Sequence, residues 1–442
     1  MLFVLGVLIL LFGVAVSIAL HEIGHLTPAK LFGVKVTQYM IGFGPTIWSR
    51  RRGETEYGVK AIPLGGYIRM IGMFPPQPGD DEGMVRASST GRWRQMTESL
   101  REATYEEIPD GDRDRVFYKL PTWKKVVVMF GGPFMNLVIA TVLLVIIACG
   151  IGLPAYKGAG VSAVLPCTAD ASGKTVATCA ASGESAAARA GLKAGDQFVS
   201  VDGTKISSTN DLVSIVQSHP NQAIPVVVRR DGRDVTLSLT PQLQKMVRTD
   251  SNGDPVLNSK GQQEYADVGV IGVSLSSKTV YERQSLSYAP GFVGSALKDT
   301  ASVFVQIPQK MVGIWNAAFG SAARSSSSPV SVVGVGRIAG DTTEAHTAVQ
   351  NKVLMLLSII ASLNMALFVF NLVPLLPLDG GHIAGALWEA VKRPIARARG
   401  VKGPVYADVA KALPLAYGVS IVLLAMFVLL AYADIVKPVK VG

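Results

Sequence analysis

Two histidines spaced four residues apart directly follow an uncharged apolar run, and this combination constrains the chain more than any other feature. The run covers residues 2–20, and the sequence HEIGH begins at the next position. On a helix, His21 and His25 lie about one turn apart on the same face, so both imidazoles can bind one zinc ion with Glu22 beside it as a general base. Because the helix continues from an apolar run, the pattern predicts hydrolysis at membrane depth.

The composition is that of a membrane protein with additional polar domains. Charged residues make up 17% of the 442 residues, whereas soluble proteins usually carry about 25%. The length allows two or three domains. The net charge of +10 is spread along the chain and not gathered in a basic arm, which argues against a nucleic-acid partner.

Four apolar stretches are long enough to span a bilayer, which takes about 20 residues. They cover residues 2–24, 126–149, 353–374 and 413–432. The first lacks the basic start and the small-residue cleavage site of a signal peptide, so we expect it to be retained. The fold class predicted is therefore a polytopic α-helical membrane protein with four transmembrane helices.

Basic residues flank these stretches unevenly and predict the orientation. They lie after the first stretch, before the second, and between the third and fourth: Arg50, Arg51, Arg52, Lys124, Lys125, Lys392, Arg393, Arg397 and Arg399. We expect a multi-pass protein of the cell (inner or plasma) membrane whose active site faces the cytoplasm. Both termini and residues 150–350 would then lie outside.

The first cytoplasmic loop contains alternating strand patterns between residues 34 and 72, separated by glycines and prolines. Residues 59–73 are charged only at Lys60 and Arg69, which indicates a β-hairpin associated with the membrane. Residues 74–118 are polar and mixed in charge, so we predict a flexible cytoplasmic segment there.

The region after the second apolar stretch has the pattern of a small α+β domain. Residues 185–203 predict a short helix, a turn and a strand, and a helix follows at 210–219. Strands at 224–230 and 234–239 flank an Asp-Gly turn, which predicts a hairpin. The pattern resembles a PDZ domain, which would bind a peptide by adding a strand to its sheet edge. A small sandwich without a peptide ligand is the alternative.

The remaining outside region is predicted from weaker patterns. Residues 268–275 alternate like one strand, and residues 325–328 are a serine-rich linker. Residues 286–320 have the spacing of an amphipathic helix, lying either on the membrane surface or against the PDZ-like region. Cys167 and Cys179 would form a disulfide if this region lies outside the cytoplasm, and two free thiols are the alternative.

These patterns divide the chain into six predicted parts. They are 1–33, the first transmembrane helix with HEIGH; 34–123, a β-rich cytoplasmic loop and flexible segment; 124–157, the second transmembrane helix; 158–280, an extracytoplasmic PDZ-like domain; 281–350, an amphipathic helix and linker; and 351–442, the third and fourth transmembrane helices with the LDGGH sequence.

A zinc peptidase needs a third protein ligand, and few candidates exist in this chain. The chain has only five histidines, and position 31, where a related motif would place one, is Leu31. The sequence NLVPLLPLDGGH at 371–382 places Asp379 at the edge of the third apolar stretch. An ionisable residue there is costly without a partner, which makes it a candidate ligand. A helix or turn cap is the alternative role.

Four motifs in this order resemble the site-2 protease family. They are HEIGH, GFGP at 42–45, GGPFMN at 131–136 and NLVPLLPLDGGH. The single PDZ-like insertion between the second and third spans is similar to the bacterial group that cleaves anti-sigma factors. The resemblance covers nearly the whole chain. Residues 328–334 resemble the family's Ser-Gly-Pro-Val-Gly motif but lack its glycine.

The resemblance implies a role for several residues. His21, His25 and Asp379 would be the zinc ligands, and Glu22 the base that activates water. Asn371 resembles the family asparagine that binds the substrate backbone or the developing oxyanion. Two further amides have weaker support: Asn364, for which an interhelical hydrogen bond is the alternative, and Asn136, which we expect to hydrogen-bond near the site.

The function implied is that of an intramembrane zinc-dependent endopeptidase in regulated intramembrane proteolysis. Its expected cofactor is Zn²⁺. Its expected partners are single-span membrane proteins, such as pre-trimmed anti-sigma factors or signal-peptide remnants, a peptide or trimmed substrate at the PDZ-like domain, and the lipid bilayer. A non-proteolytic scaffold and a membrane zinc peptidase with a glutamate ligand are the alternatives. A scaffold has no need of buried ionisable ligands, and LDGGH argues against the second type.

Overall fold

The fold is taken from a computed structural model. It describes residues 2–73, 75, 110–167, 183–248, 256, 263–320, 328–345, 347–400, 405–407 and 412–438. The chain forms two compact units, one of residues 1–150, 285–324 and 328–442, and one of residues 151–284 and 325–327. Each unit is described by itself.

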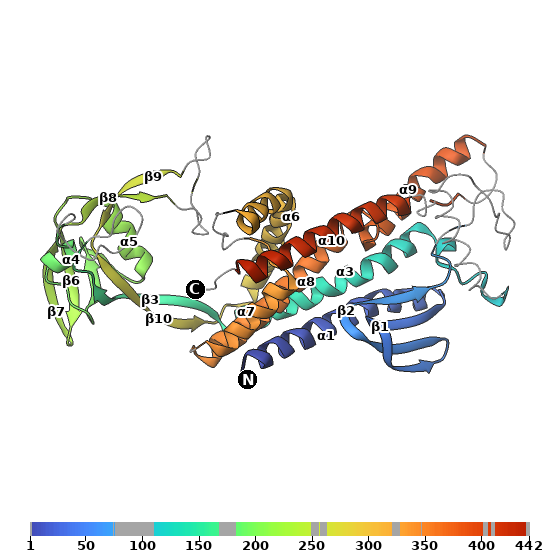
Figure 1. Ribbon diagram of the computed structural model, residues 1–442, viewed down its shortest axis with the longest axis horizontal. Coiled ribbons are helices and arrows are strands. Elements are labelled where there is room, and N and C mark those ends of the chain that lie inside the picture. Colours follow the sequence, from blue (N-terminus) through green and yellow to red (C-terminus); the bar gives the residue numbers. More distant parts are fainter. Residues whose placement is uncertain are drawn as a thin grey trace. The chain divides into compact units, whose positions relative to one another are not determined.

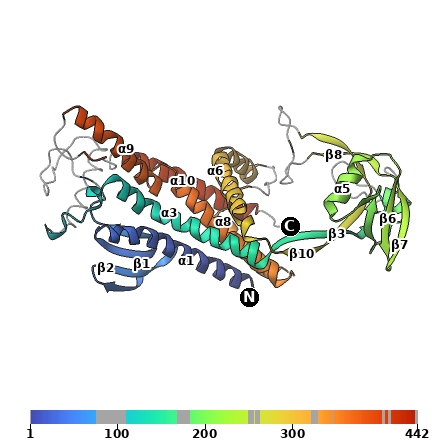
Figure 2. The same cartoon turned by 180° about the vertical axis from the view of Figure 1, so that it is seen from behind.

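Within the described part of the first unit, four helices are long and apolar enough to cross a membrane, as predicted. They are α1 (Leu2–Leu31), α3 (Thr122–Val145), α8 (Val349–Asn371) and α10 (Leu413–Val436). The predicted first span is extended in the structure, because α1 continues through HEIGH to Leu31 as one uninterrupted helix. Figure 1 shows α1 in blue beside α3 in teal, and Figure 2 shows the same pair from behind.

Three more helices of this unit lie among the described residues: α6 (Ala289–Phe319), α7 (Val332–Glu344) and α9 (Asp379–Ala398). The first confirms the helix predicted at 286–320. We predicted only a linker and motif where α7 lies. Its start is set by Ser331, whose hydroxyl oxygen accepts hydrogen bonds from the backbone of Val333 and Gly334.

Glycines allow α1 and α3 to pack backbone against backbone. A Cβ atom on Gly24 would collide with the backbone of Gly131, and a Cβ atom on Gly131 would collide with Gly24. Each collision involves main-chain atoms that cannot rotate away. The glycine inside HEIGH and the first glycine of GGPFMN are therefore required by this close approach, which brings the two motifs together.

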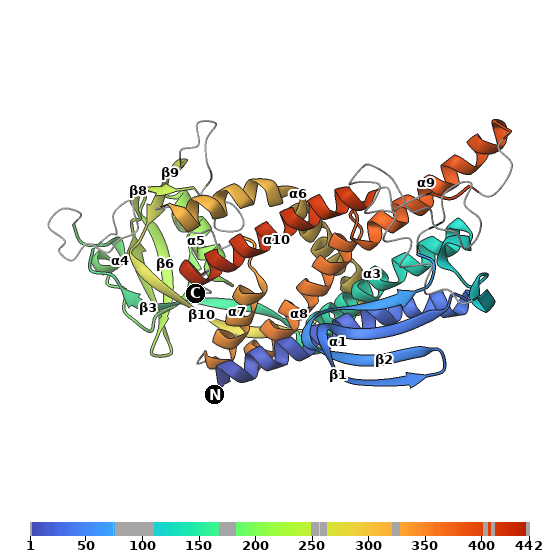
Figure 3. The same cartoon turned by 45° about the vertical axis from the view of Figure 1, so that its right-hand side comes forward.

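Two long strands, β1 (Val36–Arg52) and β2 (Thr55–Met70), form a hairpin beside α1 and confirm the strands predicted between residues 34 and 72. The separate hairpin predicted at 59–73 is wrong, because residues 55–70 form one strand that pairs with β1. Each strand bends and pairs twice, because Met40 lies opposite both Gly58 and Tyr67. Figure 3 shows these two bent strands beside α1. One outer edge is the end of β1, where residues 43–52 are exposed, and the other is the end of β2 at residues 66–70.

The flexible segment predicted at 74–118 is wrong for its last residues. Most of it lies outside the described residues, but residues 110–118 are folded against the rest of the unit. Val116, Phe117 and Tyr118 are buried, and the backbone of Phe117 and Tyr118 bonds to Ile71 and Gly72. The sequence prediction weighed the charged residues 110–115 and missed the apolar residues after them.

The second unit contains a sheet in the order β10-β3-β4-β6-β7, with β5 paired to β4. The helices α4 (Ala186–Arg189) and α5 (Thr209–Ser218) pack with it, as predicted. The strands are β3 (Leu153–Val164), β4 (Gln197–Val201), β5 (Thr204–Lys205), β6 (Ile224–Arg230), β7 (Arg233–Leu239) and β10 (Val273–Glu282), with a separate β8 (Gln242–Val247) and β9 (Tyr265–Val270) pair.

The hairpin predicted at the Asp-Gly turn is present. Asp231 and Gly232 both have positive φ, as a tight turn between β6 and β7 requires. The single strand expected at 268–275 is wrong, because β9 ends at Val270 and β10 begins at Val273. Gly272, between them, also has positive φ. Cys167 is in a disulfide. Its predicted partner, Cys179, lies outside the described residues.

Candidate metal centre

Three side chains from two helices converge beside the α1–α3 contact. His21 and His25 project from α1, and Asp379 is the first residue of α9. The Oδ2 atom of Asp379 lies 3.5 Å from Nε2 of His21 and 3.4 Å from Nε2 of His25. The two Nε2 atoms are 3.2 Å apart. These three atoms form a nearly equilateral triangle, the predicted trio brought together by the fold.

The triangle has the dimensions of one face of a tetrahedral zinc site. Ligand nitrogen and oxygen atoms lie about 2.0–2.2 Å from zinc, so two ligand atoms of a tetrahedron lie roughly 3.3–3.6 Å apart. The observed edges of 3.2, 3.4 and 3.5 Å fit this spacing. Two imidazoles and one carboxylate are also a donor set that suits zinc, leaving a fourth position for water or substrate.

The hydrogen bond made by His25 fixes which nitrogen can bind a metal. Its Nδ1 atom lies 2.8 Å from the carbonyl oxygen of Val128 on α3. A carbonyl only accepts, so Nδ1 carries the hydrogen and Nε2 of the neutral ring presents a lone pair. That lone pair faces a carboxylate oxygen and a second imidazole nitrogen, an arrangement that a cation between them stabilises. His25 is buried, so its ring is largely shielded from bulk water.

Glycines next to the triangle leave the space that its side chains and the turn before α9 occupy. A Cβ atom on Gly132 would lie 2.7 Å from Nε2 of His21 and closer still to Nε2 of His25. At the other side, Cβ atoms on Gly380 and Gly381 would collide with the backbone of residues 372–376. The turn before α9 can therefore fold back tightly enough to place Asp379 against α1 only with glycines after it.

Glu22 lies on α1 next to the triangle and is not one of its three members. Its side chain is 7% exposed, and its carboxylate accepts a hydrogen bond from the backbone of Ile68 at the end of β2. A Cβ atom on Gly66 would lie 3.1 Å from Cγ of Glu22. The edge strand of the hairpin therefore lies directly beside the predicted general base.

The three asparagines singled out by sequence are placed differently. Asn136 is fully buried, and its Nδ2 atom lies 3.0 Å from Nδ1 of His21. Asn364 donates to Ser17 on α1, which is the interhelical hydrogen bond expected as its alternative role. It also donates to the carbonyl of Ile360 on its own helix. Asn371 ends α8, and its role at the substrate backbone stays a prediction.

Sequence reasoning missed two features of this centre. The carbonyl of Val128 could not be found from residue types, because any residue offers a carbonyl. We also placed Asp379 at the end of the third span, whereas α8 ends at Asn371 and Asp379 begins a separate helix after a turn. Proline at 374 and 377 and the glycine pair are the signals for that turn.

Comparison with known proteins gives a consistent result. A sequence model of peptidase family M50 matches residues 9–415. The chain is 34% identical to zinc metalloprotease Rip1 of Mycobacterium tuberculosis, an alignment covering 100% of this chain and 99% of that protein. It is 33% identical to Rip1 of Mycolicibacterium smegmatis, covering both chains completely, and 28% identical to metalloprotease MmpA of Caulobacter vibrioides over 89% of each.

Proposed function

The chain belongs to peptidase family M50, and from that premise we propose that it is an intramembrane zinc endopeptidase. The observation that carries the proposal is the triangle of His21, His25 and Asp379, whose edges fit tetrahedral zinc. Two of its three members lie on a helix apolar enough to cross a membrane. The relatives that match over their whole length are named zinc metalloproteases, which supports the choice of metal.

The residues around the triangle divide the chemistry between them. Zinc bound there would polarise the scissile carbonyl and make water more acidic. Glu22 would take the proton from the attacking water and pass it to the leaving amine. Its buried position beside the triangle keeps its carboxylate close to the reacting atoms. Asn371 would donate to the substrate backbone or the developing oxyanion, a contact typically worth roughly 10²–10³ in rate.

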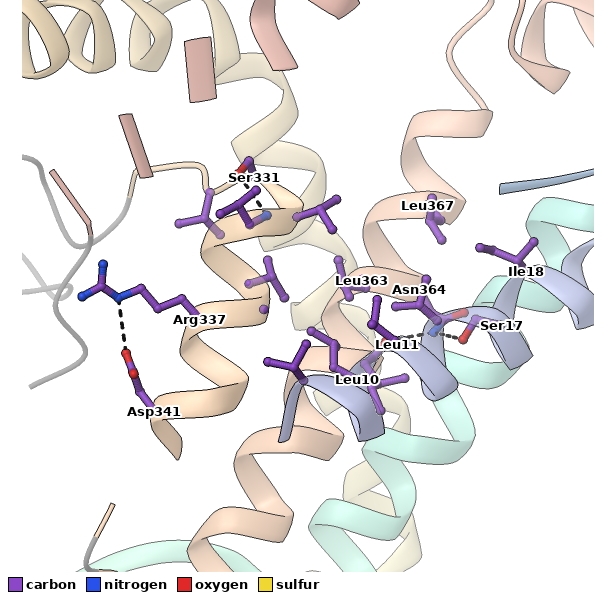
Figure 4. A pocket seen from close by; sticks show the side chains of 18 of the residues that line it. Leu10, Leu11, Ser17, Ile18, Ser331, Arg337, Asp341, Leu363, Asn364 and Leu367 are labelled. Carbon is purple, nitrogen blue, oxygen red and sulfur yellow. Dashed lines mark hydrogen bonds and ion pairs between the residues drawn. The ribbon is translucent and has the colours of Figure 1, made fainter. Parts of the chain in front are cut away.

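A cavity in the first unit supports a substrate that is itself a membrane segment. It has a volume of about 1010 Å³ and lies between α1, α7 and α8 (Figure 4). Its wall is largely apolar and includes Leu10, Leu11, Val335, Leu363 and Leu367. Along α1 the lining residues end at Ile18, which lies three residues, or nearly one helical turn, before His21. We propose that the apolar part of a substrate lies in this cavity, which leads to the zinc site.

The cavity also holds a polar group suited to an opened helix. Asn364 is 1% exposed, and its Oδ1 atom has no hydrogen-bond partner among the described residues. An intact substrate helix keeps its N–H groups in internal bonds, so cleavage requires local opening. The unpaired oxygen could accept a freed N–H group. The β2 edge at residues 66–70, beside Glu22, would pair with the opened segment as an added strand.

We propose the finer organisation on the same basis. The second unit would be a PDZ-like domain that binds a peptide or a trimmed substrate by strand addition. It would lie outside the cell membrane, with the zinc site toward the cytoplasm. Suitable substrates are single-span membrane proteins, such as anti-sigma factors already shortened by another protease or signal-peptide remnants.

Comparison of membrane proteomes tests this function. Cells with wild-type protein and cells with Glu22→Gln would be fractionated, and single-span membrane fragments quantified. The proposal predicts that such fragments accumulate in the variant and carry an apolar segment at the uncleaved site. Identical fragment profiles in the two strains, with both proteins present at equal levels, would reject it in favour of a non-proteolytic scaffold.

A further inference from the structure

Asn136 is the one other buried side chain that contacts a member of the triangle through its polar group among the described residues. It lies on α3, one helical turn beyond Gly132, and none of its surface is exposed. Its amide is 3.0 Å from Nδ1 of His21, the ring nitrogen that faces away from Asp379. The other amide atom, Oδ1, has no partner among the described residues.

The chemistry of His21 decides which amide atom must face it. If Nδ2 donates to Nδ1, then Nδ1 is the acceptor and the hydrogen of the neutral ring is on Nε2. That hydrogen would point into the triangle, and Nε2 could not bind a metal. If Oδ1 faces the ring instead, Nδ1 donates to it and Nε2 is left with its lone pair toward Asp379.

The two orientations of the amide have the same shape and are exchanged by a half-turn about the Cβ–Cγ axis. The orientation in the structure leaves Oδ1 without a hydrogen-bond partner among the described residues, so hydrogen bonding gives no reason to prefer it. The metal-binding chemistry selects the other orientation, because only that one leaves three ligand atoms with free lone pairs.

We propose that Asn136 is a positioning residue whose Oδ1 atom accepts the Nδ1 hydrogen of His21 and holds Nε2 toward the metal. This inference rests on the proposed zinc function. It gives the two imidazoles matching supports from the same helix. His25 is held by the carbonyl of Val128 and His21 by the amide of Asn136, so α3 fixes the tautomer and orientation of both rings.

This arrangement also explains why α3 must approach α1 so closely at its glycine pair. A hydrogen bond of 3.0 Å from a short asparagine side chain requires the two helix backbones to be nearly in contact. Gly131 and Gly132 provide that contact one turn before Asn136. The asparagine thus links the spacing of the helices to the geometry of the ligand atoms.

Zinc affinity in two variants of nearly equal size tests the assignment. Asn136→Asp keeps an acceptor oxygen toward Nδ1 and removes every amide donor. Asn136→Leu keeps the approximate shape and removes the acceptor. We expect Asn136→Asp to hold zinc within about threefold of wild type in a chelator competition, and Asn136→Leu to lose about 10–100-fold, the usual effect of losing a ligand's supporting hydrogen bond.

The aspartate variant alone keeps the test decisive if the leucine variant fails to fold. Were Nδ2 the atom facing His21, the wild-type ring hydrogen would lie on Nε2, and an aspartate acceptor would shift it to Nδ1 and strengthen zinc binding by far more than threefold. Such a gain, or a strong loss, would overturn the proposal, as would unchanged affinity in a folded Asn136→Leu protein. The absorption spectrum of the cobalt-substituted Asn136→Asp protein should remain that of a tetrahedral site.

Thr343→Val serves as the matched control for a general loss of buried polar contacts. Thr343 is buried and bonds to the backbone of Leu2, far along α1 from the histidines. Its replacement should lower the melting temperature and leave zinc affinity unchanged. Wild type is titrated in parallel, so that failure of wild type to bind zinc would count against the proposed function, separately from the role of Asn136.

Discussion

Lys125 of α3 and Glu389 of α9 form a buried ion pair in which Nζ lies 2.9 Å and 2.8 Å from the two carboxylate oxygens. Their side chains are 6% and 2% exposed. Glu389 also accepts hydrogen bonds from Arg393 and from the backbone of Ala407. The pair therefore joins the helix that supports both histidines to the helix that begins with Asp379.

Replacing Glu389 with alanine should destabilise the protein more than a typical substitution does. Lys125 would remain buried without a partner, which usually costs about 3–5 kcal/mol. Unfolding of the purified protein in detergent, followed by circular dichroism, measures the change. The double replacement Lys125→Met with Glu389→Met should recover much of the loss, since it leaves no lone buried charge from the pair.

An exposed ion pair provides the control for that measurement. Lys157 and Glu282 pair in the second unit with side chains 61% and 46% exposed. Surface pairs contribute about 0–1 kcal/mol, so Glu282→Gln should change stability little. Equal losses in Glu389→Ala and Glu282→Gln would contradict the role assigned to burial.

Separating metal binding from proton transfer is the second prediction. Glu22→Gln should retain zinc and lose cleavage, because the triangle is intact and the base is gone. His21→Ala and Asp379→Ala should lose both, since each removes one corner of the triangle. Metal analysis of purified protein and cleavage of a single-span reporter give the two readouts. Full activity in Glu22→Gln would remove the proposed mechanism.

The three residues that converge in the structure, His21, His25 and Asp379, were each singled out by a local signal in the sequence. A four-residue histidine spacing places both rings on one helix face, and a carboxylate at the edge of an apolar stretch needs a partner. The four spans follow from length and hydropathy in the same way. The histidine pair and the spans depend on residues near one another in the chain, whereas joining Asp379 to the histidines rested on the resemblance to site-2 proteases.

Other features depend on contacts between distant segments and could not be predicted. We counted Lys125 among the basic residues that set the orientation, and nothing in the sequence indicated its buried contact with a residue 264 positions away. The helix α7 was missed because its glycine-rich sequence has low intrinsic helix propensity, and packing against α1, α8 and α10 compensates. Asn136 had a suggested location but no suggested partner until the structure placed it beside His21.

A single methyl group next to the metal centre should abolish zinc binding. In Gly132→Ala, the added Cβ atom would collide with Nε2 of both histidines, the atoms that form two corners of the triangle. The rings cannot move aside without leaving their hydrogen bonds to α3. Gly418→Ala is the control, because that glycine of α10 has open space around it and alanine favours a helix by up to about 1 kcal/mol. Zinc content after dialysis distinguishes the two.

Acid should weaken the second unit through Asp196. Two hydrogen bonds of 2.7 Å from Arg230 hold the pKa of this buried carboxyl below its usual value. A lowered folded-state pKa stabilises the fold above the ordinary aspartate pKa of about 3.9, and the contribution is lost as pH falls through the folded-state pKa. Hydrogen exchange of residues 197–239, corrected for intrinsic rates, should therefore accelerate as pH falls below about 4.

Two variants check the cause of that acid effect. Asp196→Asn should already exchange faster at pH 7, by an amount equivalent to about 1–2 kcal/mol, and should lose the further acceleration in acid. Asp234→Asn is the matched control, because Asp234 pairs with Arg229 in the same way but is half exposed. Identical profiles for Asp196→Asn and wild type would show that this ion pair does not contribute.

Cysteine labelling tests the proposed orientation. Residues 50–52 form an exposed arginine run at the end of β1, and such runs are retained in the cytoplasm. Gly111 is exposed in the same unit on the segment that packs against the hairpin's end, and Lys205 is exposed in the second unit. In a Cys149→Ser background, an impermeant maleimide should label Lys205→Cys on intact cells and Gly111→Cys only after permeabilisation.

The opposite pattern would reverse the orientation and place the zinc site near the outer face. Labelling of both residues after denaturation verifies that each thiol is reactive, so protection of Gly111→Cys in intact cells can be assigned to the membrane.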